Sequence, residues 1–251
     1  RNYESAYYGR AIVYKDLEQY YNAIDDYTKA IRIDPNYRNA YYGRGIVYKI
    51  LEKYHDAIDD YNKVIKIDPD YVRVYVARGN VYYSLGEYRD AISDYNKAIR
   101  KDRNYSLGYY NRGNAYKVLE QYYNAIDDYS KVIRIDPNYK FAYYQRGHSY
   151  TKLERYRDAI DDYNKAIKID PNYLIPMEGR GIGSNPYNNR GRVYYYLESY
   201  ENAIADFTRS IKIPRLSELA VISKNTSSSA PSWSYILANS TGSPASFRFK
   251  K

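Results

Sequence analysis

The chain has 251 residues, of which 39 are lysine or arginine and 30 are aspartate or glutamate, giving a formal net charge of +9. It contains no cysteine, which excludes disulfides and thiolate chemistry. No apolar run approaches the roughly 18–20 residues that span a bilayer, and no signal peptide is visible. These absences favour a cytoplasmic location. The basic excess serves solubility, although it also suits acidic peptides, anionic membranes or RNA.

One stretch, Asp34–Ile67, is 34 residues long and has close copies on both sides. Its boundary dipeptide recurs on a 34-residue grid, at Asp34-Pro35, Asp68-Pro69, Asp136-Pro137 and Asp170-Pro171, and Asp102-Arg103 fills the remaining slot. A fixed period of this size indicates a solenoid, in which each unit buries its apolar face against its neighbours. The chain opens inside such a boundary without Met, and we interpret it as a fragment or a processed chain.

Complete units fall at about 2–35, 36–69, 70–103, 104–137 and 138–171, and an irregular sixth ends near Pro214. In the second unit, apolar and small residues recur at helical spacing before and after a short turn at Glu52-Lys53. Each unit is therefore predicted to be an antiparallel helix pair. The boundary proline ends the second helix and suits the first turn of the next one.

The repeated slots hold the same residue types in six copies. The first helix has a large aromatic slot at Tyr7, Tyr41, Tyr75, Tyr109, Tyr143 and Tyr187, and a small slot at Ala11, Gly45, Gly79, Gly113, Gly147 and Gly191. The second helix has a small slot at Ala23, Ala57, Ala91, Ala125, Ala159 and Ala203, and an aromatic slot at Tyr27, Tyr61, Tyr95, Tyr129, Tyr163 and Phe207.

This pattern resembles the tetratricopeptide repeat (TPR) family over about residues 1–214. The resemblance implies an all-α fold, a right-handed α-solenoid of stacked antiparallel helix pairs that forms a TPR superhelix. The tyrosine content is unusual for a soluble protein, with 39 Tyr against 4 Phe and 1 Trp. Its ring can pack while its hydroxyl meets water or a partner.

Two charged slots also recur in all six units. Arginines precede the small residue of the first helix at Arg10, Arg44, Arg78, Arg112, Arg146 and Arg190. Aspartates precede the second-helix aromatic at Asp26, Asp60, Asp94, Asp128, Asp162 and Asp206. They form either a ladder of Arg–Asp pairs between helices or independent solvated charges.

The sixth unit is interrupted by Pro176 and by three nearby glycines, and its helical pattern restarts ten residues late. We therefore divide the chain into five regular units at 1–173, an inserted loop or hinge at 174–186, a sixth unit at 187–214, a capping helix at 215–224 and a low-complexity, disordered tail at 225–251.

No catalytic, cofactor or metal site is predicted. The two histidines, His55 and His148, lie almost three units apart, and the adjacent aspartates point in different directions on their helices. No glycine-rich phosphate loop is present, because Gly179–Gly183 lacks the flanking strand and the following lysine. The chain is therefore not expected to be an enzyme.

The resemblance implies that the first helices line a concave groove whose outward positions contact a peptide. Carried over to this sequence, the peptide-binding positions are Tyr8, Tyr42, Asn80, Tyr110, Asn111, Asn114, Tyr144, Gln145, His148 and Asn189. Gly43 is a further position expected on the exposed face. Side-chain amides both donate and accept hydrogen bonds and so suit an extended peptide backbone, although the asparagines could instead be idle solvated residues.

We therefore predict a non-enzymatic scaffold that binds an extended peptide or a partner protein. One alternative is an RNA-binding solenoid that stacks bases on tyrosine. The cations late in the second helices argue against it, so nucleic acid is not the expected partner. Another alternative is a structural rod that self-associates through its open repeat ends.

Overall fold

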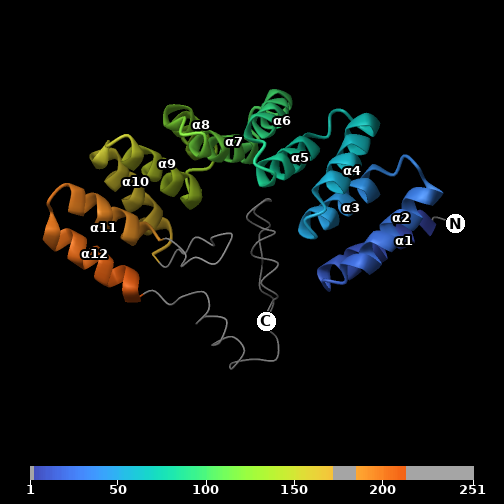
Figure 1. Cartoon of the computed structure of the whole chain (residues 1–251), viewed down its shortest axis with the longest axis horizontal. Coiled ribbons are helices and arrows are strands. Elements are labelled where there is room, and N and C mark those ends of the chain that lie inside the picture. The colour runs from blue at the N-terminus through green and yellow to red at the C-terminus, as the bar shows by residue number, and fades with distance from the viewer. Residues whose placement is uncertain (1–2, 172–184, 213–251) are drawn as a thin grey trace. The chain divides into compact units, whose positions relative to one another are not determined.

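The computed structural model describes residues 3–171 and 185–212, which form twelve α-helices and no strand. The helices are α1 (Tyr3–Asp16), α2 (Tyr20–Ile33), α3 (Arg38–Ile50), α4 (Tyr54–Ile67), α5 (Val72–Ser84), α6 (Tyr88–Lys101), α7 (Ser106–Val118), α8 (Tyr122–Ile135), α9 (Lys140–Lys152), α10 (Tyr156–Ile169), α11 (Pro186–Tyr196) and α12 (Tyr200–Lys212). Figure 1 shows consecutive helices, such as α1 and α2, running antiparallel side by side. The prediction of an all-α fold of stacked helix pairs is confirmed.

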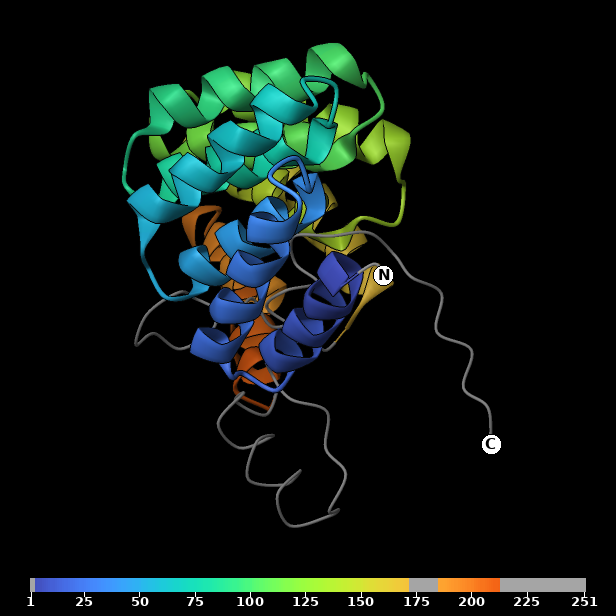
Figure 2. The same ribbon diagram turned by 90° about the vertical axis from the view of Figure 1, so that its right-hand side faces the viewer.

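The contacts divide the described residues into two compact units of several repeats each, the first within Arg1–Asp128 and the second within Tyr129–Lys251. In the first unit each second helix packs against its own first helix and against the first helix of the next pair, as α2 does against α1 and α3. The same stacking of α1 to α4 is visible from the side in Figure 2. In the second unit α10 joins α9 to α11 in the same way.

Each pair turns through a residue in the left-handed region of backbone space. This residue is glutamate in five pairs, at Glu18, Glu52, Glu120, Glu154 and Glu198, with φ between 56° and 60°. The remaining pair, α5 and α6, has Gly86 there, with φ of 80°. The conformation allows the chain to reverse direction between two helices that are joined by only three residues, such as Leu51–Lys53.

Between pairs, the boundary aspartate organises the loop. The side chain of Asp34 accepts a hydrogen bond from the backbone N–H of Asn36 at 2.9 Å, and the same turn recurs after Asp68, Asp102 and Asp136. The next helix, α3, begins only at Arg38. The expectation that Pro35 lies in the first turn of that helix is therefore wrong, because the aspartate-centred turn holds this proline before the helix.

Small residues set the distance between the two helices of a pair. A Cβ atom added to Gly45 would lie 2.6 Å from the Tyr61 ring, and one added to Gly79 would lie 2.6 Å from the Tyr95 ring. Both rings are fully buried, and Ala57 and Ala91 are buried beside them. The tyrosine of the second helix thus occupies the volume that a side chain at the glycine would need.

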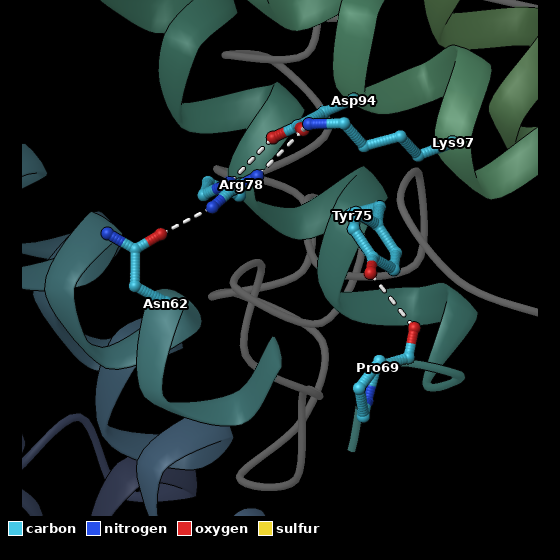
Figure 3. A network of polar contacts seen from close by, with 6 residues as sticks. All are labelled: Asn62, Pro69, Tyr75, Arg78, Asp94 and Lys97. Atoms are coloured by element: carbon cyan, nitrogen blue, oxygen red, sulfur yellow. Dashed lines mark hydrogen bonds and ion pairs between the residues drawn. The ribbon is translucent and has the colours of Figure 1, made fainter. Parts of the chain in front are cut away.

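The ladder of Arg–Asp pairs is confirmed in all six repeats, and the alternative of independent solvated charges is wrong. In the third repeat the Nε and Nη2 atoms of Arg78 donate to the carboxylate of Asp94 at 2.6 and 2.8 Å (Figure 3). The third nitrogen, Nη1, donates to Asn62 of the preceding repeat, and Lys97 lies 2.9 Å from the same carboxylate. Each arginine therefore links its own two helices, and from the second repeat onward it also reaches the preceding repeat.

The inserted loop predicted at 174–186 lies outside the described residues except at its end. There Asn185 caps α11 by accepting a hydrogen bond from the backbone N–H of Asn188 at 2.9 Å, and Pro186 is the first helical residue. The sixth helix pair thus begins one residue before the predicted start at 187. The predicted capping helix at 215–224 and the tail at 225–251 lie outside the described residues.

Candidate functional site

The first helices of the first unit form one continuous face. Helix α1 contacts α3, α3 contacts α5, and α5 contacts α7, whereas no contact joins α2 to α4 or α4 to α6. Because neighbouring repeats approach one another more closely on the first-helix side, this side is the inner face of the stack within residues 3–128. We call it the first-helix face.

The predicted tyrosines of this face pack at the junctions between repeats. The Tyr8 ring lies 5.9 Å from the Tyr27 ring of its own repeat and 5.2 Å from the Tyr37 ring of the next. Tyr42 makes the equivalent contacts with Tyr61 and Tyr71. Burial raises the pKa of the Tyr42 hydroxyl. Both rings are half-buried, so only part of each ring's surface is accessible.

Gly43 does not belong to the exposed surface. It is buried, and a Cβ atom added to it would lie 2.7 Å from the Tyr27 ring of the preceding repeat. The expectation that Gly43 faces a partner is therefore wrong. This glycine lets α3 approach α2, which is a packing role.

Two of the predicted asparagines come together in the first unit. The Nδ2 atom of Asn111 on α7 donates to Oδ1 of Asn80 on α5 at 3.0 Å. The hydroxyl of Tyr95 on α6 donates to the same oxygen at 2.7 Å. Tyr95 was predicted only as a packing aromatic, and a phenylalanine could not hold Asn80 in this way. In the sequence, the presence of Tyr instead of Phe at this slot was the signal that the ring could also form a hydrogen bond.

This network fixes the orientation of both amides. The oxygen of Asn80 is engaged twice, which leaves its Nδ2 without a partner among the described residues. Asn111 uses its nitrogen, which likewise leaves its Oδ1 as an acceptor without a partner in the described part of the chain. Both side chains are half-buried. The pair therefore offers one donor and one acceptor side by side, and a peptide bond carries the complementary acceptor and donor.

Helix α7 adds further polar groups to the first-helix face. Tyr110 and Asn114 lie half-buried on it, beside Asn111. One turn further on is Lys117, also half-buried, and burial lowers the pKa of its ammonium group to about 8. The charge at Lys117 is thus held in surroundings that disfavour it.

The remaining predicted positions lie in the second unit, on α9 and α11. Gln145 and His148 are half-buried on α9. Tyr144 and Asn189 are buried, and the Asn189 amide donates to the Tyr144 hydroxyl at 2.5 Å. The expectation that these two residues point outward is wrong, because they use their polar groups on each other across two stacked helices.

Two other kinds of feature, a metal site and a membrane-spanning helix, concern residues 3–171 and 185–212. In these ranges no group of three or more His, Asp or Glu side chains is placed to hold a metal ion. No helix in the same ranges is long and apolar enough to cross a membrane.

The stacked helix pairs, with one small and one aromatic residue at each internal contact, define an α-solenoid built from helix-pair repeats. Tetratricopeptide repeat profiles match residues 5–37, 106–139 and 141–173, and another matches 184–215. A profile described as TPR repeat matches residues 47–86 and 79–119. Together these matches cover more than half of the chain, which therefore belongs to the tetratricopeptide repeat family.

Solved structures of the same architecture include MamA, with 26% sequence identity, a TM-score of 0.60, and coverage of 67% of this chain and 92% of MamA. YrrB, described as a TPR protein with an unusual peptide-binding site, has 25% identity and a TM-score of 0.55, covering 66% of this chain and 85% of YrrB. PilF of Pseudomonas aeruginosa, with 19% identity and a TM-score of 0.68 over 81% of this chain and 88% of PilF, shows the shared fold alone. No curated protein matches the sequence significantly.

Proposed function

We propose that the protein is a non-enzymatic interaction scaffold that binds an extended segment of a partner protein on the first-helix face. The observation that carries this proposal is the oriented pair of amides at Asn80 and Asn111. An extended peptide exposes its backbone N–H and C=O groups, and the pair can accept from one and donate to the other. Membership of the TPR family and the peptide-binding site named for YrrB support the same class of partner.

Side chains around this pair would supply contact area and selectivity. Tyr8 and Tyr42 offer ring edges along α1 and α3, and Tyr110 and Asn114 lie beside the pair on α7. Tyrosine is enriched in protein interfaces because a large ring with two rotatable bonds gives contact area at low entropic cost. In the second unit, Gln145 and His148 on α9 remain proposed contacts, whereas Tyr144 and Asn189 act through the packing of α9 and α11.

The proposal is tested by selecting binders to the whole chain from a random peptide library and measuring their affinity for an Asn111→Ala variant. This change removes the unpartnered acceptor but leaves Tyr95 bonded to Asn80. Loss of one or two hydrogen bonds should cost about 1–3 kcal/mol, which weakens binding by about fivefold to 150-fold.

The matched control is Asn124→Ala. Asn124 is an exposed amide on the second helix α8, where it bonds only to the Gln121 side chain at 3.2 Å. Binding should not change in this variant. Equal affinities for wild type, Asn111→Ala and Asn124→Ala would exclude the first-helix face as the peptide site.

A further inference from the structure

Negative charge lies mostly outside the first helices of the first unit. Helices α3, α5 and α7 contain no aspartate or glutamate, whereas α2, α4 and α6 each contain at least two. Helix α1 carries Glu4 and Asp16 near its two ends, and Asp16 lies 3.2 Å from Lys15. The repeated arginines of the first helices are paired in the Arg–Asp ladder. The remaining charge on α3, α5 and α7 therefore comes from cations outside the ladder.

Arg73, the exposed second residue of α5, differs from the other cations that begin a first helix. Arg38, in the first turn of α3, pairs with the boundary aspartate Asp68, and Lys140 of α9 pairs with a boundary aspartate in the same way. No ion pair or hydrogen bond joins Arg73 to a described residue, including Asp102, which occupies the slot of Asp68. A cation in the first turn also opposes the helix macrodipole, so Arg73 does not stabilise α5.

Two tyrosine hydroxyls lie near this guanidinium, one from the repeat before and one from the repeat after. They belong to Tyr42 on α3 and to Tyr105, which directly precedes α7. Burial raises the pKa of both phenols, and the positive charge of Arg73 acts against that rise. Both phenols therefore stay protonated and can donate hydrogen bonds. A carboxylate can accept hydrogen bonds from a guanidinium and from hydroxyls together, because its two oxygens offer about four lone-pair sites.

Arg73 also lies at a suitable distance from the amide pair of the first-helix face. Asn80 follows it by seven residues on α5, so the two share one side of the helix. Seven residues rise about 10.5 Å along a helix axis, and an extended peptide advances about 3.3 Å per residue. A segment whose backbone bonds to Asn80 and Asn111 therefore reaches Arg73 with a side chain about three residues away.

We infer that the segment bound on the first-helix face is acidic, and that one of its Asp or Glu side chains pairs with Arg73 between Tyr42 and Tyr105. This inference rests on the proposed function, because it names the charge of the partner at the same site. The half-buried Lys49 and Lys117 add positive charge near the other ends of α3 and α7. With no carboxylate on α3, α5 or α7, further acidic side chains of the segment meet no repulsion from these helices.

The experiment selects binders to the whole chain from a random library of short synthetic peptides with blocked ends, so that Asp and Glu side chains supply the only carboxylates. The selected peptides should be enriched in Asp and Glu. Arg73→Gln should weaken the binding of a selected acidic peptide about fivefold, the upper end for an exposed ion pair. Replacing the acidic residue of the peptide by its amide should weaken binding to the wild type by the same factor and leave binding to Arg73→Gln unchanged.

The matched control is Arg89→Gln. Arg89 is likewise exposed and is the second residue of a helix, the second helix α6, and it too has no ion pair with a described residue. Because both arginines are exposed, both variants should fold. Binding of the acidic peptide should not change in Arg89→Gln, and an equal loss in both variants would overturn the inference, since it would reflect only the net charge of the chain.

Measuring each peptide against Asn111→Ala as well separates this inference from the proposed function. Weaker binding to both Asn111→Ala and Arg73→Gln supports the acidic segment. Weaker binding to Asn111→Ala alone, or no enrichment of Asp and Glu, would overturn the acidic segment and leave the proposed function standing. Unchanged binding to both variants would overturn both. A single-stranded RNA of mixed sequence that binds the wild type, where no acidic peptide binds, would overturn the inference and indicate phosphate as the anion.

Discussion

At the scale of single residues, the repeated arginine is distinguished by its bidentate pairing with a buried carboxylate. In the third repeat the Asp94 side chain is almost completely buried and accepts from both Arg78 and Lys97. A bidentate guanidinium–carboxylate pair is geometrically specific, and its charges need each other once they are removed from water. Arg78 also donates to Asn62 of the preceding repeat, so its side chain links the two helices of one repeat and also links two neighbouring repeats.

Asp94→Asn should therefore be strongly destabilising. It leaves the Arg78 charge without its carboxylate, and breaking a buried pair typically costs about 3–5 kcal/mol. Urea denaturation measures this as a lower midpoint. The control is Asp25→Asn, which breaks a more exposed pair with Lys29, worth only about 0.2–0.5 kcal/mol. Similar midpoints for the two variants would show that the Arg–Asp ladder contributes little.

The contribution of Lys117 to the free energy of unfolding should depend on pH. Burial lowers its pKa to about 8, below the value of about 10.4 expected in the unfolded chain. Between these values the unfolded state binds more protons, so stability at this site rises with pH from 8 to 10 and is least at neutral pH.

Lys117→Met removes the buried charge and should raise the free energy of unfolding at pH 7 by about 1–3 kcal/mol. The advantage over the wild type should shrink as the pH approaches 10. Thermal unfolding of both proteins across this range measures the difference. A constant difference at all pH values would show that the ammonium group is not disfavoured in the folded state.

At the scale of elements, each helix pair is held at a fixed separation by the contact between a small residue and an aromatic ring. The same substitution at two glycines separates this effect from helix propensity. Gly79→Ala places a Cβ atom 2.6 Å from the Tyr95 ring, whereas Gly9→Ala meets nothing within 4 Å. Tyr95 cannot easily move, because its hydroxyl is bonded to Asn80.

Gly79→Ala should lower stability by about 1–3 kcal/mol through overpacking, despite the better helix propensity of alanine. Gly9→Ala should raise it by up to about 1 kcal/mol, because only propensity acts there. The melting temperatures of the two variants, compared with that of the wild type, show whether each substitution stabilises or destabilises the protein. A stabilised Gly79→Ala protein would contradict the packing account.

The helix pairs were predictable from sequence because the 34-residue period and the helical spacing of apolar residues are local properties. The Arg–Asp pairs could be proposed, since both slots recur together, but their geometry depends on how two helices dock. The left-handed residue of the turn was not predicted, although Gly86 at the slot occupied elsewhere by glutamate was a usable signal.

The site was only partly predictable for a related reason. Helical spacing shows which positions share a face. How exposed each position is depends on how much of that face the neighbouring repeat covers. Tyr144, Asn189 and Gly43 share the predicted face and are nevertheless buried by neighbouring helices. The Asn80–Asn111 contact joins two repeats, and no spacing within one repeat indicates it.

At the scale of the whole molecule, the repeats conserve their packing groups and vary the groups they present. The small, aromatic and Arg–Asp slots are nearly constant along the chain, whereas the slot of Asn80 holds Ile12, Ile46, Asn114, His148 and Arg192 in the other repeats. A constant scaffold with a changing surface is what a selective peptide-binding protein requires, because stability and recognition are then carried by different residues.

The most direct test of this account is amide hydrogen exchange of the whole chain with and without a peptide selected by binding. We predict that the bound peptide slows exchange in the first helices α5 and α7, which carry Asn80 and Asn111, and leaves the second helices α4 and α6 unchanged. Slower exchange confined to α4 and α6, with α5 and α7 unaffected, would contradict peptide binding on the first-helix face.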